Sequence, residues 1–153
     1  MTKVLIAVDS SDTSIRAART AHNLFGDDAA YTVVSVAPLD PVIWGEDTLA
    51  WGTPYSMARP PMGSPLDLPR VTTMIEQAAQ IAQTVADSAD VSGARIVGDD
   101  GDPVEAILAA ASAYEVDVIV VGSHDRSWFT RLLSPSTASA VVRRADLPVL
   151  VAR

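Results

Sequence analysis

Residues 122–137 combine the residue types and spacing that an anion site would use. Gly122 follows a short apolar run at 116–121, and a segment with helical spacing comes after the loop. A strand, a loop and a helix N-terminus in this order present backbone N–H groups that bind phosphate. Two residues oppose that chemistry, because Asp125 adds a negative charge and Pro135 removes a backbone donor.

Ser123, His124 and Asp125 are the residue types of a catalytic triad. Neighbouring side chains point apart, so three consecutive residues cannot align as nucleophile, base and orienting group. The second histidine, His22, lies far away in the sequence, and without any cysteine no zinc motif can be recognised. Neither a Walker A sequence nor G-x-G-x-x-G is present. The sequence therefore predicts no catalytic and no metal-binding residues, and it leaves slow ATP hydrolysis open.

Composition narrows the class of protein. The chain has 153 residues, 48% of them hydrophobic, which suits one domain with a sizeable core. Its formal net charge of −8 repels nucleic-acid backbones and anionic membranes, so we expect neither as a partner. No apolar run reaches the roughly 18 residues of a membrane span. With no cysteine as well, the sequence predicts a cytoplasmic protein.

Apolar runs of strand length alternate with segments of helical spacing. Strands are expected at 4–8, 31–36, 94–97, 116–121 and 148–152, and helices at 15–25, 71–88, 102–113 and 136–144. A turn is expected at 98–101, between the third strand and the helix that Asp102 caps. This alternation predicts a single α/β domain over 1–153, a doubly wound five-stranded parallel sheet with helices on both faces.

Residues 38–69 interrupt the pattern. Seven of the ten prolines lie here, together with Trp44 and Trp51, and no periodicity is present. We expect an irregular proline-rich insertion within the domain. A loop this long in a small domain is usually functional or disordered, so it is either a flexible loop without a task or a lid or interface.

Four short motifs resemble those of the universal stress protein family. They are VLIAVDSS at 4–11, GDP at 101–103, IVVGSH at 119–124 and LPVLV at 147–151. The resemblance covers nearly the whole chain in the expected order. It implies a strand order of 3-2-1-4-5 and a cleft at the carboxyl ends of strands 1 and 4, where the winding of the sheet reverses.

Family members that bind ATP carry a glycine pattern, Gly-x₂-Gly-x₉-Gly-Ser/Thr. The corresponding positions here are Gly122, Asp125, Pro135 and Ser136, so only the first glycine and the final hydroxyl match. A carboxylate about 4 Å from a phosphate charge costs about 4 kcal/mol at an effective dielectric near 20. The loop is similar to a family branch that lacks the glycines and does not bind ATP. The sequence therefore predicts a degenerate nucleotide site with weak affinity for ATP.

The resemblance also implies roles for individual residues in this cleft. Asp9 would contact the adenosine part of a ligand, although it is equally placed to stabilise the first helix through the helix dipole. The backbone of Val36 would contact the edge of the adenine. Ser136 and Thr137 would still offer hydroxyls and N–H groups, and Arg126 would partly restore a positive field.

The last strand starts at Pro148, ends at Ala152 and would be an edge of the sheet in the implied order. An apolar edge strand without charge invites pairing with another chain. Family members commonly pair this strand antiparallel in a dimer, which implies a symmetric homodimer. The alternative is a monomer whose edge is covered.

Three hypotheses of function follow. The first is a non-enzymatic, dimeric stress-response or signalling protein of the universal stress type, with a degenerate nucleotide site and no required cofactor. The second is an ATP- or AMP-binding member that uses the cleft at strands 1 and 4. The third is a module that binds an unknown protein partner through the insertion at 38–69.

Overall fold

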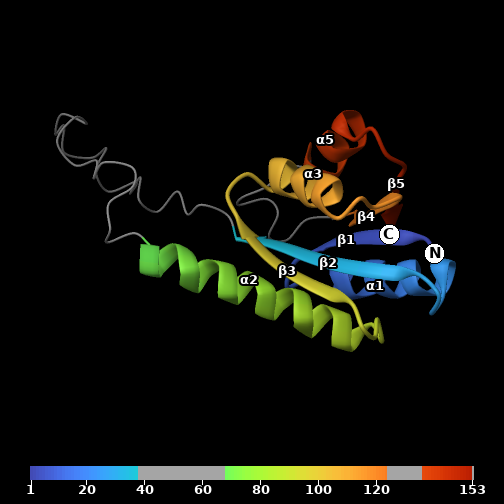
Figure 1. Cartoon of the computed structure of the whole chain (residues 1–153), viewed down its shortest axis with the longest axis horizontal. Coiled ribbons are helices and arrows are strands. Elements are labelled where there is room, and N and C mark those ends of the chain that lie inside the picture. Colours follow the sequence, from blue (N-terminus) through green and yellow to red (C-terminus); the bar gives the residue numbers. More distant parts are fainter. Residues whose placement is uncertain (38–67, 124–135, 153) are drawn as a thin grey trace, which may run out of the picture.

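A computed structural model describes residues 1–37, 68–123 and 136–152 (Figure 1). Most of the proline-rich insertion and the loop after the fourth strand lie outside these residues, so the hypotheses about them are not tested. The described elements are β1 (Lys3–Val8), α1 (Asp12–Phe25), β2 (Ala30–Ala37), α2 (Leu68–Ser88), β3 (Arg95–Asp100), α3 (Pro103–Ala113), β4 (Val118–Gly122), α5 (Ser136–Arg144) and β5 (Val149–Ala152).

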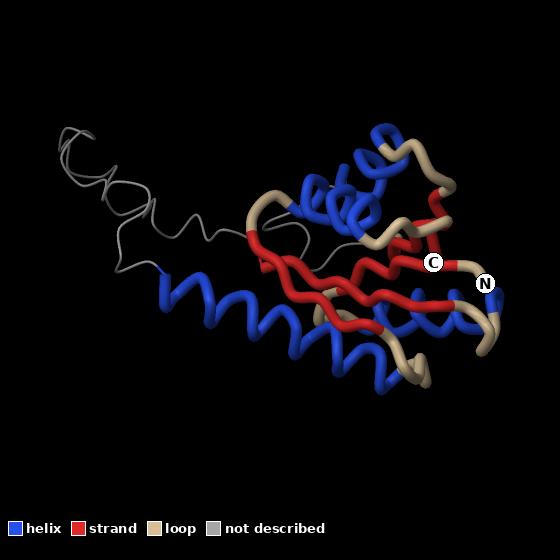
Figure 2. The backbone as a smooth tube through the Cα atoms, viewed as in Figure 1, coloured by secondary structure: helices blue, strands red, loops and turns tan. Residues whose placement is uncertain are grey.

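The five strands form one parallel sheet in the order β3-β2-β1-β4-β5 (Figure 2). Helices α1 and α2 cover one face, and α3 and α5 cover the other (Figure 1). The predicted fold class and strand order are therefore confirmed. β1 lies at the centre of the sheet, between β2 and β4, and the order of the strands reverses there.

The central strands are buried on both sides, as their continuous apolar runs predict. Ile6 of β1 packs into the core under α1 and α2, whereas its neighbour Leu5 packs into the core under α3 and α5. Val120 and Ile119 of β4 divide between the two cores in the same way. All four side chains are fully buried, so the sheet has no solvated face along its middle.

The helix ends follow their local capping signals. Ser11 is the N-cap of α1, and Gly26 ends this helix with a φ of 72°, a conformation that favours glycine. Asp102 is the N-cap of α3 and accepts a hydrogen bond from the Glu105 backbone nitrogen at 2.9 Å. Pro103 occupies the first helical turn, where a missing N–H costs nothing. The cap predicted at Asp102 is confirmed.

Helix α2 begins earlier than the sequence pattern predicts. We expected the irregular segment to continue to residue 69, but the helix starts at Leu68. A proline at position 69 is compatible with this start, since proline is tolerated in the first turn of a helix. The insertion therefore ends two residues earlier than its prolines predict.

Strand β3 continues where a turn was predicted. Gly98 pairs with Ser35 of β2, and Asp99 and Asp100 extend the same pairing to the end of β2. Of the expected turn at 98–101, only Gly101 leaves the strand, with a φ of 102°. The glycine at 98 serves packing instead of a turn, because helix α2 passes directly over it.

The turn between α1 and β2 is held by Tyr31, whose hydroxyl donates to the Gly26 carbonyl at 2.7 Å. Burial raises the pKa of Tyr31 above its ordinary value, and the negative charge of Asp27 adds to the shift. The hydroxyl therefore keeps its proton and remains a donor. His22 is half-buried on α1 beside this turn, as expected for a packed helix residue.

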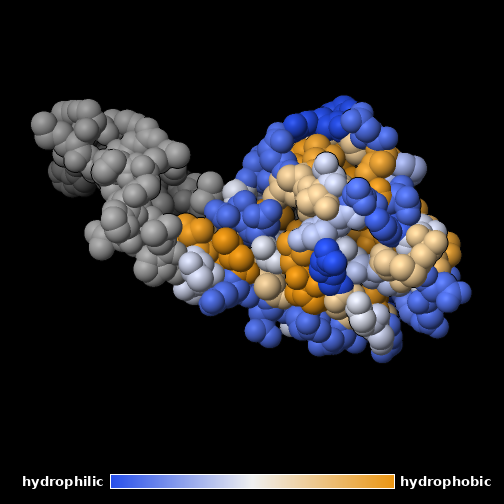
Figure 3. Space-filling model, in the orientation of Figure 1, coloured by the Kyte–Doolittle hydropathy of each residue, from blue (hydrophilic) through white to orange (hydrophobic). Residues whose placement is uncertain are grey.

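The visible surface mixes hydrophilic side chains with separate apolar patches (Figure 3). Leu24, Val142 and Val151 are among the most exposed large apolar residues of the part described. Across residues 1–37, 68–123 and 136–152, no helix is long and apolar enough to cross a membrane.

Gly98→Ala tests the close approach of α2 to β3. A Cβ at this position would lie 2.6 Å from the Ala79 backbone nitrogen and would also clash with the Ile75 carbonyl oxygen. Both atoms belong to the helix backbone and cannot rotate away. We therefore expect a loss of about 3 kcal/mol or more in the free energy of unfolding, at the upper end for overpacking, measured by urea denaturation.

The matched control is Gly93→Ala, a glycine with no atom within 4 Å of an added Cβ. Its φ of 71° makes alanine cost about 1–2 kcal/mol through backbone strain alone. If Gly98→Ala lowers the free energy of unfolding by no more than Gly93→Ala does, helix α2 does not pack as closely on β3 as the structure shows.

Candidate functional site

A cleft of about 590 Å³, counting the space that opens to solvent, lies at the carboxyl ends of β1, β2 and β4. The first turns of α1, α3 and α5 complete its walls. This is the point where the strand order reverses, and open α/β sheets usually bind ligands there.

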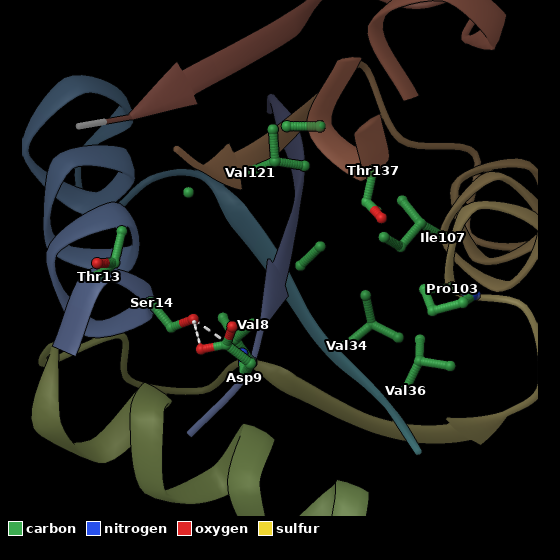
Figure 4. Close-up of a pocket in the computed structure, with 13 residues that line it drawn as sticks. Val8, Asp9, Thr13, Ser14, Val34, Val36, Pro103, Ile107, Val121 and Thr137 are labelled. Carbon is green, nitrogen blue, oxygen red and sulfur yellow. Dashed lines mark hydrogen bonds between the residues drawn. The ribbon is translucent and has the colours of Figure 1, made fainter. Parts of the chain in front are cut away.

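One wall of the cleft is apolar (Figure 4). Val34 and Val36 contribute from β2, and Val121 contributes from β4. Pro103 and Ile107 are four residues apart on α3, so they lie on the same side of the helix and face the cleft together. Such a wall offers methyl and methylene groups to a flat or apolar part of a ligand.

The opposite end of the cleft is polar and is built around Asp9, the residue that follows β1. Its Oδ1 accepts hydrogen bonds from the Ser11 backbone nitrogen at 2.8 Å and from the Ser14 hydroxyl at 2.7 Å. The Ser14 oxygen in turn accepts from the backbone nitrogen of Asp9 at 2.8 Å (Figure 4). Asp9 and Ser14 are both buried, so this arrangement is shielded from water.

Gly122 also lines the cleft, at the end of β4. A Cβ at this position would lie 3.1 Å from the Thr13 methyl group. The absence of a side chain therefore lets the end of β4 approach the first turn of α1. Thr13 is buried, and its hydroxyl accepts a hydrogen bond from Arg16 at 3.2 Å.

Thr137 brings a hydroxyl to the cleft from the first turn of α5. It is buried, and Figure 4 shows it on the side of the cleft near Ile107 and Val121. The start of a helix carries a partial positive charge on its backbone N–H groups. The cleft therefore has hydrogen-bond donors at this end and a carboxylate at the other.

Charge in the described part of the cleft is confined to Asp9. None of the described residues that line it is a lysine, an arginine or a histidine. No group of three or more histidine, cysteine, aspartate or glutamate side chains within the described residues is placed to hold a metal ion. The described lining thus suits a ligand that donates hydrogen bonds and has an apolar face.

The comparison with protein families identifies the family of the chain. The sequence matches the model of the Universal stress protein family over residues 1–153. The chain belongs to the universal stress protein family. The predicted resemblance is therefore confirmed for the family.

Individual relatives are distant. The chain is 25% identical over 154 residues to Universal stress protein MJ0531 of Methanocaldococcus jannaschii, a match that covers 99% of this chain and 81% of that protein. It is 33% identical over 54 residues to Stress response protein NhaX of Bacillus subtilis (strain 168), covering 35% of this chain and 32% of that protein. The chain thus matches about a third of the length of NhaX.

Solved structures share the fold. A universal stress protein crystallised in complex with cAMP superposes with a TM-score of 0.58 at 20% identity, covering 99% of this chain and 96% of that one. At 20% identity, this similarity supports only a shared fold, that is, the arrangement of strands and helices.

The structure of this universal stress protein brings four of the predicted site residues to one cleft: Asp9, Val36, Gly122 and Thr137. Their roles toward a ligand stay predictions. Ser136 is the first residue of α5, whereas Asp125 and Arg126 lie outside the described residues.

Two of the predicted residues have more than one role in the structure. The resemblance implies a contact through the backbone of Val36, and its half-buried side chain also lines the cleft. Asp9 was expected either to face a ligand or to stabilise the first helix. It does line the cleft, and its carboxylate also accepts hydrogen bonds from the residues that begin α1.

Sequence reasoning missed Ser14, Pro103 and Ile107, which also line the cleft. A signal for Pro103 was present, since it is the first residue of a capped helix that follows a strand, and Ile107 lies about one turn further along the same side of that helix. Ser14 gave a weaker signal because a serine near a helix start is usually attributed to capping.

Proposed function

We propose that this universal stress protein is a non-enzymatic stress-response or signalling protein whose cleft binds adenosine or an adenine nucleotide with one phosphate, and binds ATP weakly. The proposal rests mainly on the charge of the cleft. Its described lining residues include one buried carboxylate and no cationic side chain. A triphosphate would bring several negative charges next to this carboxylate, and the described lining residues offer no positive side chain to match them.

The apolar wall supports an adenine ring as the anchoring part of the ligand. Val36, Pro103 and Ile107 present apolar atoms to the cleft from two elements. Val36 also lies one residue beyond the last pairing of β2 with β1, which joins Ser35 and Val8. The backbone at Val36 is therefore close to the end of the β1–β2 ladder, where the family resemblance implies contact with the edge of the adenine.

The sequence of the loop after β4 supports weak binding of ATP. Asp125 replaces a glycine of the ATP-binding pattern with a second carboxylate, and Pro135 replaces another with a residue that has no N–H. A lost hydrogen bond to a charged group is worth roughly 1.5–3 kcal/mol, which is about tenfold or more in affinity. Arg126 offsets part of the charge but not the lost donor.

The comparison with solved structures supports an adenine nucleotide of low charge. The family member in complex with cAMP, at 20% identity, binds a nucleotide with a single phosphate. A ligand of this kind would place its base on the apolar wall, its sugar near Asp9 and its one phosphate near the first turn of α5.

Titration calorimetry with adenosine, AMP and Mg-ATP tests the proposal. We expect adenosine and AMP to bind more tightly than Mg-ATP. In the double variant Asp125→Gly/Pro135→Gly, the affinity for Mg-ATP should rise by at least about tenfold, because one carboxylate is removed and one N–H donor restored. Adenosine affinity should stay unchanged, since adenosine carries no phosphate.

A matched control is Asp28→Gly, which removes the same negative charge from an exposed position in the turn before β2. It should leave the affinity for Mg-ATP within about twofold, because charges that are far apart and exposed are screened. Submillimolar affinity of the unaltered chain for Mg-ATP would overturn the proposal and favour an ATP-binding member.

We also propose that two copies pair through β5 in a symmetric homodimer. The sheet has two edges, and they differ in character. β3 carries Arg95, Asp99 and Asp100, which discourage pairing. β5 has the uncharged sequence VLVA, and Val151 is 40% exposed. An uncharged edge next to exposed apolar groups favours antiparallel addition of an identical strand.

Val151→Lys should weaken the dimer by at least about tenfold, since a two-fold interface places the new charge on both copies, close to its own symmetry mate. Sedimentation or light scattering over a concentration series measures the shift. Leu24→Lys adds the same charge at a residue of α1 that is 62% exposed, and it should leave dimerisation unchanged. An unaltered chain that stays monomeric at micromolar concentration would rule out this assembly.

A further inference from the structure

We propose that Ser14 is a positioning residue that fixes the carboxylate of Asp9, so that the cleft selects ligands with free sugar hydroxyls. The inference rests on the proposed function of the cleft as an adenosine site. It adds a residue that acts through Asp9 and a chemical criterion for the ligand, which is the presence of hydroxyl donors on the sugar.

The geometry around Asp9 shows why a hydroxyl is needed at residue 14. The Ser14 oxygen donates to Oδ1 of Asp9 at 2.7 Å and accepts from the backbone nitrogen of the same residue at 2.8 Å. One hydroxyl therefore ties both the side chain and the main chain of Asp9. Only a group that donates and accepts at once can make both contacts.

Helix capping does not account for this arrangement. The N-cap of α1 is Ser11, whose side chain accepts from the Ser14 backbone nitrogen at 3.3 Å. The Ser14 hydroxyl points back to Asp9 and not to the backbone of its own helix (Figure 4). Its hydrogen bonds therefore serve the residue at the end of β1, which lines the cleft.

Fixing one carboxylate oxygen also fixes the other. Oδ1 receives two donors, from the Ser11 backbone nitrogen and the Ser14 hydroxyl, and both restrict the rotation of the carboxylate. Asp9 is only 4% exposed and Ser14 only 5%, so water does not replace either contact easily. A carboxylate held in this way is preorganised to accept hydrogen bonds from hydroxyl groups of a bound molecule.

The decisive experiment compares adenosine with 2′,3′-dideoxyadenosine by titration calorimetry on the full chain. The two ligands share the base and the sugar ring but differ in the hydroxyl groups. We expect the unaltered chain to bind adenosine about tenfold or more tightly, because hydrogen bonds to a buried carboxylate are of the stronger, charge-assisted class.

Ser14→Ala should reduce this preference to within about threefold, while the affinity for dideoxyadenosine changes by less than about twofold. The ratio of the two affinities is the readout, since a general loss of structure lowers both. Ser14→Thr keeps a hydroxyl and should restore the preference. Ala21→Gly weakens the same helix at a buried position away from the cleft, and it should leave the ratio unchanged.

A double-mutant cycle with Asp9→Asn shows whether Ser14 acts through Asp9. The variants Asp9→Asn and Asp9→Asn/Ser14→Ala should have the same ratio, because the second change removes a support that no longer matters. A further loss of preference in the double variant would assign Ser14 a direct contact with the ligand and overturn the positioning role.

The remaining outcomes separate the inference from the proposed function. If the unaltered chain prefers adenosine and Ser14→Ala keeps that preference, the inference is wrong and the adenosine site stands. If the unaltered chain binds both ligands equally, Asp9 does not bind the sugar hydroxyls, and again only the inference fails. If neither ligand binds at millimolar concentration, the proposed function and the inference both fail.

Discussion

The cleft exists because the helices associated with β1 and β4 pack on opposite faces of the sheet. α1 follows β1 and lies with α2, whereas α5, the next described helix after β4, lies with α3 (Figure 1). Two adjacent parallel strands whose connections diverge leave a crevice at their carboxyl ends. The polar end at Asp9 belongs to the α1 side, and the apolar wall with Ile107 belongs to the α3 and α5 side.

The charge of the protein limits what can bind in that crevice. The chain carries a formal net charge of −8, and the one charged group of the described lining is a carboxylate. Long-range attraction of a polyanion is therefore unfavourable, and affinity must come from apolar contact and from hydrogen bonds at short range. Both are available in the cleft, on the wall formed by Val36 and Pro103 and at the pair Asp9 and Ser14.

Much of the fold could be predicted from the sequence, and the limits have physical reasons. Fully buried strands such as that of Leu5 and Ile6 give long apolar runs, and the caps at Ser11 and Asp102 have local signals. Strand order has no local signal and followed only from the family resemblance. The sequence predicts a turn at Gly98 because a glycine that admits a passing helix has the same sequence signature as one that bends the chain.

The site was predictable to a lesser extent because it depends on contacts between elements. Asp9 and Gly122 stand at the ends of apolar runs, and both line the cleft. The bond between Ser14 and Asp9 depends on how the first turn of α1 folds back on the end of β1, which no spacing rule specifies. The loop residues Asp125 and Arg126 lie outside the described residues, so their part rests on the sequence argument alone.

The pairing of β4 with β5 connects the cleft to the edge of the sheet. Gly122, which lines the cleft, pairs with Ala152 at the end of β5. The next backbone nitrogen, that of Ser123, donates to the Ala152 carbonyl at 2.6 Å, so the loop after β4 starts from a hydrogen bond to the edge strand. A substitution that displaces the end of β5 would therefore also move Gly122. Ligand affinity and dimerisation have to be measured on the same variants, because only a change in one without the other assigns a residue to the cleft or to the edge.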